Sequence, residues 1–205
     1  MKITNERLKM RIYGLLGKEE NEKITEYELE KITSFSICQK NEKLEDVYFT
    51  DNDFECLKFV KSLTLSMFII DDKIIERINN MKNLKSITFS ECIFNTSEKI
   101  KSNLSTVIIV NPIALDINIF YSVLNVTCLE FVDAVDLDVS DLTRFENIEW
   151  LYLYNCKLRN FESVKNFKNL KKIYLDGSNV TIESLDELIK RDILVEYSDK
   201  YLPVV

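Results

Sequence analysis

The chain has 205 residues, a formal net charge of −7 and no histidine. The lack of histidine excludes Ser-His-Asp and Cys-His catalysis, and every metal site that needs an imidazole ligand. The negative charge argues against direct binding to nucleic acid or to an anionic membrane surface, because phosphates would be repelled. An apolar content of 46%, with Gly 3 and Pro 2, indicates one folded unit rather than domains joined by flexible linkers.

The five cysteines form no C-x-x-C pair, so zinc and redox sites are poorly supported and free thiols in a reducing compartment are expected. The N-terminal residues lack the apolar segment of a signal peptide, and no apolar run approaches the length of a membrane span. We therefore expect a cytoplasmic protein without cofactor, metal or membrane contact. The alternative is a secreted or surface protein from which a signal peptide has been removed.

The first 34 residues predict two short helices. A helix is expected over residues 5–16, closed by Gly17, with an apolar face made of Leu8, Ile12, Leu15 and Leu16. Thr25 and Glu28 form a capping box, which opens a second, short helix.

A repeat dominates the remainder of the chain. The run Ile148–Leu158 has apolar residues at positions one, four, six and eleven and a small polar residue, Cys156, at position nine. This is the leucine-rich-repeat pattern L-x-x-L-x-L-x-x-N/C-x-L. It returns 22 residues later from Leu170 and begins 22 residues earlier at Val126. At position nine, a short buried donor is expected to bond to the backbone of a neighbouring turn.

The same template predicts nine short parallel strands, starting at residues 35, 47, 63, 87, 107, 129, 151, 173 and 195. The strand at 47 belongs to a repeat that begins at Leu44 and matches the template at every position. Helical crossings are expected over Lys73–Asn79 after an Asp72 cap, and over Ile182–Arg191 with Leu185, Leu188 and Ile189 facing inward. Residues 158–167 resemble the tight 3₁₀ crossings of bacterial leucine-rich-repeat proteins of the internalin type, which implies such a crossing here.

The run from Leu16 to Ser34, followed by these repeats, resembles the N-terminal cap of bacterial leucine-rich-repeat proteins of the internalin type. The resemblance implies an α/β leucine-rich-repeat solenoid, a horseshoe with strands on the concave face and helices and 3₁₀ turns on the convex face. It implies a cap over residues 1–34 and a single continuous repeat array over residues 35–205.

Positions three, five and seven of each repeat should face the concave surface, because side chains alternate along a strand. In the N-terminal half these positions are mostly Ser and Thr, whereas the C-terminal half carries aromatic residues. We predict a partner-binding surface there, the concave aromatic patch, made of Trp150, Tyr152, Tyr154, Tyr174, Ile108, Val132, Glu130 and Asp176. The competing interpretation is that exposed tyrosines reflect strand propensity and cross-strand packing.

The expected function is a non-catalytic protein-interaction module whose protein partner has a basic or apolar surface. One alternative is an acidic inhibitor or effector that occludes a macromolecular machine, and another is a fragment of an internalin-like surface adhesin. The pairs Asp51/Asp53 and Asp71/Asp72 offer carboxylates for acid–base work or calcium, but both lie at turns where Asp commonly serves as a turn former or helix cap. The oligomeric state is left open.

Overall fold

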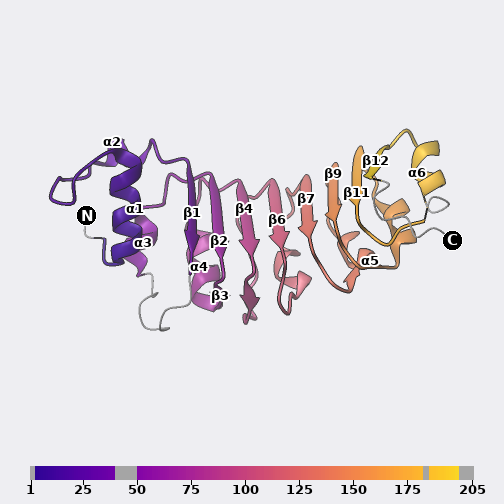
Figure 1. The fold of residues 1–205 in the computed structure, drawn as a ribbon, viewed down its shortest axis with the longest axis horizontal. Helices are drawn as coiled ribbons and strands as arrows, with labels where there is room; N and C mark the ends of the chain where they lie inside the picture. Colours follow the sequence, from indigo (N-terminus) through magenta and orange to yellow (C-terminus); the bar gives the residue numbers. More distant parts are fainter. Residues whose placement is uncertain (1–2, 40–49, 182–184, 199–205) are drawn as a thin grey trace.

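The computed structural model describes residues 3–39, 50–181 and 185–198. Its main feature is a parallel sheet whose strands lie side by side along the molecule in the order β1-β2-β4-β6-β7-β9-β11-β12 (Figure 1). The strands are β1 (Ser34–Cys38), β2 (Ser62–Ser66), β4 (Ser86–Ser90), β6 (Thr106–Val110), β7 (Cys128–Val132), β9 (Trp150–Tyr154), β11 (Lys172–Asp176) and β12 (Leu194–Ser198).

Adjacent strands pair with equivalent repeat positions opposite one another, as in Leu129↔Leu151 and Leu151↔Ile173. From β2 to β11, positions four and six are buried while positions three, five and seven remain partly exposed. One repeat cannot bury its apolar positions alone, so stacking of neighbours completes the core. The predicted leucine-rich-repeat solenoid is confirmed.

The prediction of a strand near residue 47, between those at residues 35 and 63, is wrong. β1 is hydrogen-bonded directly to β2, with Ser34 opposite Ser62, so no strand lies between them. Residues 40–49 lie outside the described residues. The rest of the matching repeat forms helix α3 (Asp51–Glu55), in which Phe54 is buried. A capping box between Thr50 and Asp53 starts this helix, and an inward-facing helical residue satisfies the template as well as a turn residue does.

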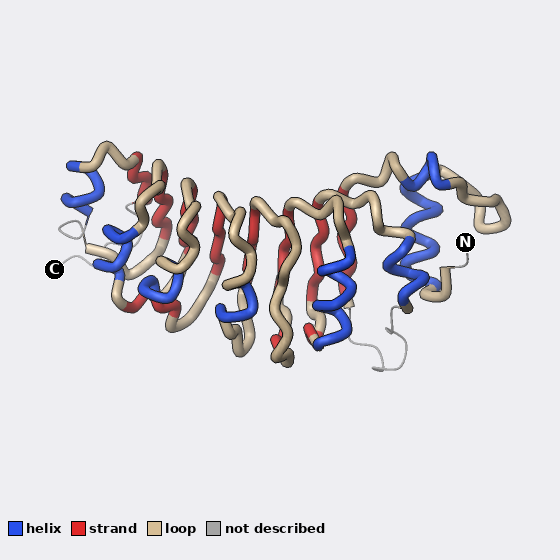
Figure 2. Tube along the Cα trace, turned by 180° about the vertical axis from the view of Figure 1, so that it is seen from behind, coloured by secondary structure: helices blue, strands red, loops and turns tan. Residues whose placement is uncertain are grey.

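The connections between strands cross the opposite side of the sheet, as the view from behind shows (Figure 2). They contain α4 (Asp72–Asn80), η2 (Ile117–Phe120), α5 (Val139–Leu142), η3 (Phe161–Asn166) and α6 (Asp186–Lys190). The 3₁₀ crossing predicted over residues 158–167 is confirmed by η3. The cap of α4 is Asp71 rather than Asp72. Ile189 is 57% exposed, because the short helix α6 turns only Leu188 fully inward.

Two small parallel sheets form where the chain leaves the main sheet. They pair β3 (Ile69–Ile70) with β5 (Ile93–Phe94), and β8 (Leu137–Asp138) with β10 (Leu158–Arg159).

The turn after each inner strand has the same backbone conformation. Position eight has a positive φ in six repeats, at Met67, Glu91, Asn111, Asp133, Asn155 and Gly177. In the first five of these, the N–H of position eight donates to the last carbonyl of the next strand, as Glu91 does to Val110 at 2.9 Å. The left-handed residue therefore bends the chain out of the sheet at the same place in each repeat.

Position nine then bonds back to the preceding repeat. Cys92 Sγ lies 3.3 Å from the Leu65 carbonyl oxygen, and Ser178 Oγ donates to that of Leu153 at 2.9 Å. The short donor predicted at position nine is present, but its acceptor is a strand carbonyl of the preceding repeat rather than the backbone of a neighbouring turn, and Ser178 is only partly buried.

An asparagine ladder runs along the other end of the strands, one residue before position one. The side-chain amides of Asn83, Asn147 and Asn169 each donate to a carbonyl of the preceding repeat at 2.7–2.9 Å. Stacking thus satisfies backbone groups that would otherwise lack partners in these turns.

Helices α1 (Glu6–Leu16) and α2 (Glu26–Leu29) lie at the β1 end of the sheet (Figure 1). As predicted, Gly17 closes α1 in the left-handed conformation and Thr25 and Glu28 form a capping box. Leu8 and Ile12 are buried, but Leu15 is 55% exposed because it lies beyond the part of the helix that faces the core. An apolar helix covering the end strand protects an edge that would otherwise expose core and backbone.

Candidate functional site

The eight residues of the concave aromatic patch come together on four adjacent strands. Tyr152 on β9 lies opposite Glu130 on β7 and Tyr174 on β11, and Ile108 on β6 lies opposite Glu130. In the row closer to the strand ends, Tyr154 lies between Val132 and Asp176. Trp150 occupies the remaining row, opposite Cys128 and Lys172.

The three tyrosines pack against one another. The rings of Tyr154 and Tyr174 have centroids 4.7 Å apart, and those of Tyr152 and Tyr154 are stacked at 6.3 Å. Such ring pairs contribute about 0.5–1.5 kcal/mol each beyond the area that they bury. All three remain partly exposed, and Trp150 is 39% exposed. The cluster therefore packs internally and also presents ring surface to solvent.

Lys172 lies inside the patch, although the sequence prediction did not include it. Its Nζ is 2.9 Å from Glu196 Oε2 and 6.0 Å from the centroid of the Tyr152 ring. The hydrogen bond to Glu196 raises the pKa of Lys172 above its ordinary value. Its position three in the repeat, which it shares with Trp150, could have indicated from the sequence that Lys172 faces the patch. Its pairing with Glu196 depends in addition on the register between β11 and β12. This pair neutralises the charge of Glu196 beside the patch.

Glu130 has a different environment. It is half-buried, and it forms no hydrogen bond or ion pair within the part of the chain that the structure describes. Burial raises the pKa of its carboxyl above the ordinary value. The pKa of Tyr154 is also raised, by burial first and then by the nearby charge of Glu130.

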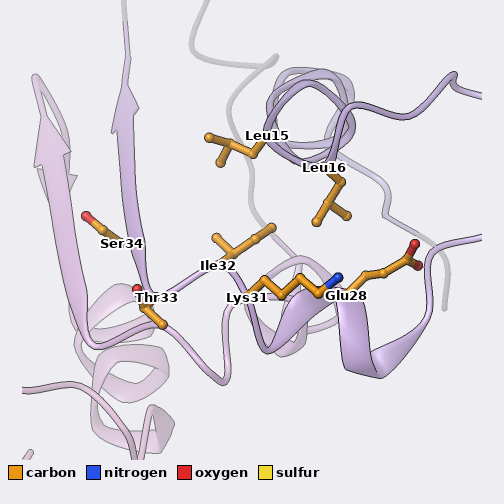
Figure 3. Close-up of a pocket in the computed structure, with 7 residues that line it drawn as sticks. All are labelled: Leu15, Leu16, Glu28, Lys31, Ile32, Thr33 and Ser34. Atoms are coloured by element: carbon orange, nitrogen blue, oxygen red, sulfur yellow. The ribbon is translucent and has the colours of Figure 1, made fainter.

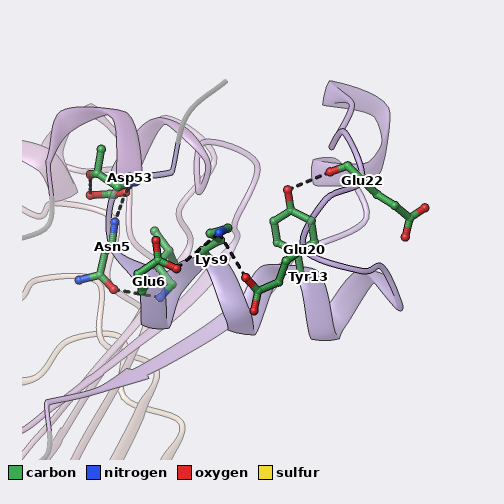
Figure 4. A network of polar contacts seen from close by, with 9 residues as sticks. Asn5, Glu6, Lys9, Tyr13, Glu20, Glu22 and Asp53 are labelled. Carbon is green, nitrogen blue, oxygen red and sulfur yellow. Dashed lines mark hydrogen bonds and ion pairs between the residues drawn. The ribbon is translucent and has the colours of Figure 1, made fainter.

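The aspartates considered as catalytic or calcium-binding pairs form hydrogen bonds with other groups of the chain. Asp53 is fully buried and accepts hydrogen bonds from Thr4, Asn5 and Thr50, part of the network drawn in Figure 4. Burial acts to raise the pKa of Asp53, but these hydrogen bonds outweigh it and lower the pKa. A helix cap and a tether thus account for this carboxylate.

Asp71 and Asp72 have similar structural roles. Asp71 caps α4 by accepting from the Ile74 N–H at 2.9 Å, and Asp72 accepts from Thr96 Oγ1 at 2.6 Å. Among the described residues, no group of three or more Cys, Asp or Glu side chains is arranged to hold a metal ion.

All five cysteines are free thiols. Burial raises the pKa of Cys56, Cys92 and Cys156 to about 11 in each case. A thiol that stays protonated at neutral pH is a weak nucleophile.

A second exposed apolar feature lies outside the concave face, and the sequence interpretation missed it. Position ten carries an aliphatic side chain in four successive repeats, and these form a position-ten stripe of Ile69, Ile93, Ile113 and Val135, each at least 40% exposed. Ile69 pairs with Ile93, which bridges to Ile113. Aligning the repeats would have shown these four aliphatic residues at position ten. The next repeat has Lys157 there, which ends the stripe.

Two concavities lie at the N-terminal end of the molecule. One opens between the end of α1 and the start of β1, where Leu15 and Leu16 stand across from Ile32 (Figure 3). The other lies between α1 and the concave side of β1, with Arg11 and Phe35 among its lining residues. Neither includes a residue of the concave aromatic patch.

No protein-family model and no curated protein sequence matches the chain. Its structure superposes on internalin C2 of Listeria monocytogenes with a TM-score of 0.61, covering 96% of this chain and 94% of that one. The fold is that of an internalin-like leucine-rich-repeat protein. Sequence identity to internalin C2 is 14%, so the likeness concerns the fold. A second internalin of that organism, inlF, is 14% identical with a TM-score of 0.48, covering 96% of this chain and 69% of that one.

Within the described ranges, none of the helices is long and apolar enough to cross a bilayer.

Proposed function

We propose that this chain is a non-catalytic interaction module that binds a protein partner on the concave aromatic patch. The observation that carries the proposal is the tyrosine cluster, which remains partly exposed beside Trp150 on one sheet face. Apolar surface left exposed in this way commonly marks an interaction site. A curved repeat array suits the role, because its concave face is extended and continuous across the strands.

The physical state of the tyrosines favours binding over a purely structural role. Tyr154 and Tyr174 already restrain each other at 4.7 Å, so little side-chain freedom remains to be lost when a partner docks. Tyrosine and tryptophan also combine large area with a polar group, which is why truncating such an anchor in an interface commonly costs about 2 kcal/mol or more.

The remaining chemistry of the chain supports the non-catalytic part of the proposal. The candidate carboxylates Asp53, Asp71 and Asp72 are engaged by backbone and hydroxyl donors. Three of the five thiols are buried, and the chain has no histidine to activate a nucleophile. Five free thiols also favour a reducing, cytoplasmic location over the surface of a cell.

The net charge of −7 is the observation that favours the second candidate, an acidic protein that occludes a basic channel of a macromolecular machine. Binding of that kind is dominated by charge and weakens steeply with salt. Binding through the aromatic patch depends on apolar contact and resists salt.

The test compares capture of a partner from the host lysate by the wild type and by a Trp150→Ala/Tyr152→Ala variant. Val135→Asp is the matched control, because it alters an exposed apolar residue in the position-ten stripe, outside the patch. Circular dichroism and urea unfolding establish that each variant is folded.

We expect the wild type and Val135→Asp to retain the partner at about 0.5 M salt, where exposed charges are screened, and the double variant to lose it. Equal capture by the double variant would overturn the proposed site. Loss of capture in salt, with no effect of the double substitution, would favour the occlusion function.

A further inference from the structure

The concave aromatic patch contains one carboxylate in uncharged surroundings. Around Glu130, the registers of β6, β7 and β9 place eight neighbours on the same face, namely Thr106, Ile108, Val110, Cys128, Val132, Trp150, Tyr152 and Tyr154. Direct neighbours across a sheet lie about 5 Å apart and diagonal ones about 7–8 Å. None of the eight carries a charge at neutral pH, so no cation lies next to this carboxylate on the sheet face.

Within the described residues, two other buried or half-buried carboxylates, Asp53 and Asp138, are compensated by hydrogen bonds. Asp53 accepts from Thr4 and Thr50, and Asp138 accepts from Ser140 Oγ. Glu130 loses part of its hydration to the neighbouring strands and gains no donor in exchange. A half-buried charge left in this way costs free energy unless a counter-charge or donor is supplied.

The described residues supply no such counter-charge. Among positions three, five and seven of the described strands, Lys172 is the one cation, but it is engaged by Glu196 at 2.9 Å. It also lies on β11, two strands away from Glu130 on β7, which is about 10 Å across the sheet. A cation for Glu130 must therefore come from outside the described chain.

We propose that Glu130 binds a basic side chain, an arginine or lysine, of the protein partner. The charged end of that side chain lies between the carboxylate and the face of Tyr152, and its methylene stem packs on Ile108 and Val132. This inference rests on the proposed function, because it names the chemistry that the aromatic patch recognises.

Each group around Glu130 favours this occupant. A carboxylate in a partly dehydrated site binds a guanidinium or ammonium group more strongly than one in water. The tyrosine ring face attracts cations, as Lys172 already shows on Tyr152 at 6.0 Å. Arginine and lysine carry long apolar stems that cover aliphatic surface. An anionic partner would meet Glu130 and Asp176 and be repelled.

The test selects random peptides displayed on phage against the full-length wild-type chain and, in parallel, against Glu130→Gln. The substitution keeps the size of the side chain and removes its charge. We expect the peptides selected on the wild type to be enriched in arginine or lysine beside an apolar residue. We expect that enrichment to disappear in the parallel selection.

Affinities of the selected peptides are then read from the fluorescence of Trp150, the one tryptophan in the chain. Removing one partner of a desolvated charge pair typically weakens binding about 30-fold or more, and we expect this for Glu130→Gln. Replacing the basic residue of the peptide by glutamine should then cause no further loss in Glu130→Gln. The matched control is Asp133→Asn, an exposed acid just beyond the same strand, for which we expect a change below about twofold.

The outcomes separate the two proposals. Peptides that require Tyr152 and Tyr174, yet bind Glu130→Gln as well as the wild type, overturn the inference about Glu130 and leave the proposed function standing. Peptides that bind equally well after both tyrosines are changed to alanine overturn the proposed site itself.

Discussion

Asp53 accepts a hydrogen bond from the backbone N–H of Thr4 at 2.7 Å, although the two residues are 49 positions apart. The same carboxylate accepts from the Thr50 N–H at 2.8 Å, so it joins the start of α3 to the segment that enters α1 (Figure 4). We propose that the cap over residues 1–34 and the array over residues 35–205 unfold as one unit, with this buried carboxylate as a main connection.

Asp53→Asn should lower the free energy of unfolding by about 2 kcal/mol or more. One carboxylate oxygen faces the N–H groups of Thr4 and Asn5 and the other faces that of Thr50, so either orientation of the amide sets a donor against a donor. Urea unfolding measures the effect. The control, Asp51→Asn, alters an exposed carboxylate paired with Arg77 and should change stability by less than about 1 kcal/mol. Similar losses for both variants would show that the tether is weak.

Glu91→Asn should raise the free energy of unfolding by about 0.5–1 kcal/mol, since asparagine tolerates the left-handed conformation better than glutamate. Glu91 has φ 54 at position eight, where three other repeats have Asn111, Asn155 and Gly177. Gly177 has φ 67 at the same position, and Gly177→Ala should lower stability by about 1 kcal/mol or more. Thermal unfolding of both variants tests the pair, and changes of the same sign in both would contradict the explanation.

Cys92 and Cys156 should react with a thiol reagent only when the protein opens, whereas exposed Cys38 should react at once.

Burial raises the pKa of Cys92 and Cys156 from 9.0 to about 11. The unfolded chain therefore loses these protons first, and the free energy of unfolding should fall as pH rises from about 9 to about 11. Urea titrations across this range measure the slope. The Cys92→Ser/Cys156→Ser variant should show a shallower fall, and an unchanged slope would assign the effect to other groups.

Glu130→Gln should be at least as stable as the wild type at pH 7, in contrast to its expected loss of binding. Burial raises the folded-state pKa of Glu130 above the ordinary value of 4.5, so the ionised group opposes folding above that folded pKa. As pH falls toward 4.5, the folded state takes up its proton first and the difference between the two proteins should shrink. Urea unfolding at several pH values checks this. A variant less stable than the wild type at pH 7 would reveal a structural partner for Glu130.

The repeat architecture could be predicted from the sequence because each repeat contains the local pattern that determines its own structure. Leu151 and Leu153 face the core and Tyr152 and Tyr154 the concave surface, simply because side chains alternate along a strand. The short donor at position nine, Cys156 for example, follows from the same local pattern. Where a local signal was ambiguous the prediction failed. The strand expected near residue 47 has no place between β1 and β2, and the described end of that repeat forms α3, because a capping box and the buried Phe54 also suit a helix.

What the sequence by itself determined is therefore the fold, the direction in which each repeat residue points, and the gathering of aromatic residues on one face. Only the tertiary structure decided which residues meet across repeats. It pairs Lys172 with Glu196, joins Asp53 to Thr4, and gives Glu130 no counter-charge among the residues that the structure describes. The physical reason is that these relationships depend on the register and stacking of different strands, and on an N-terminal segment packed far from its position in the sequence, which local periodicity does not encode.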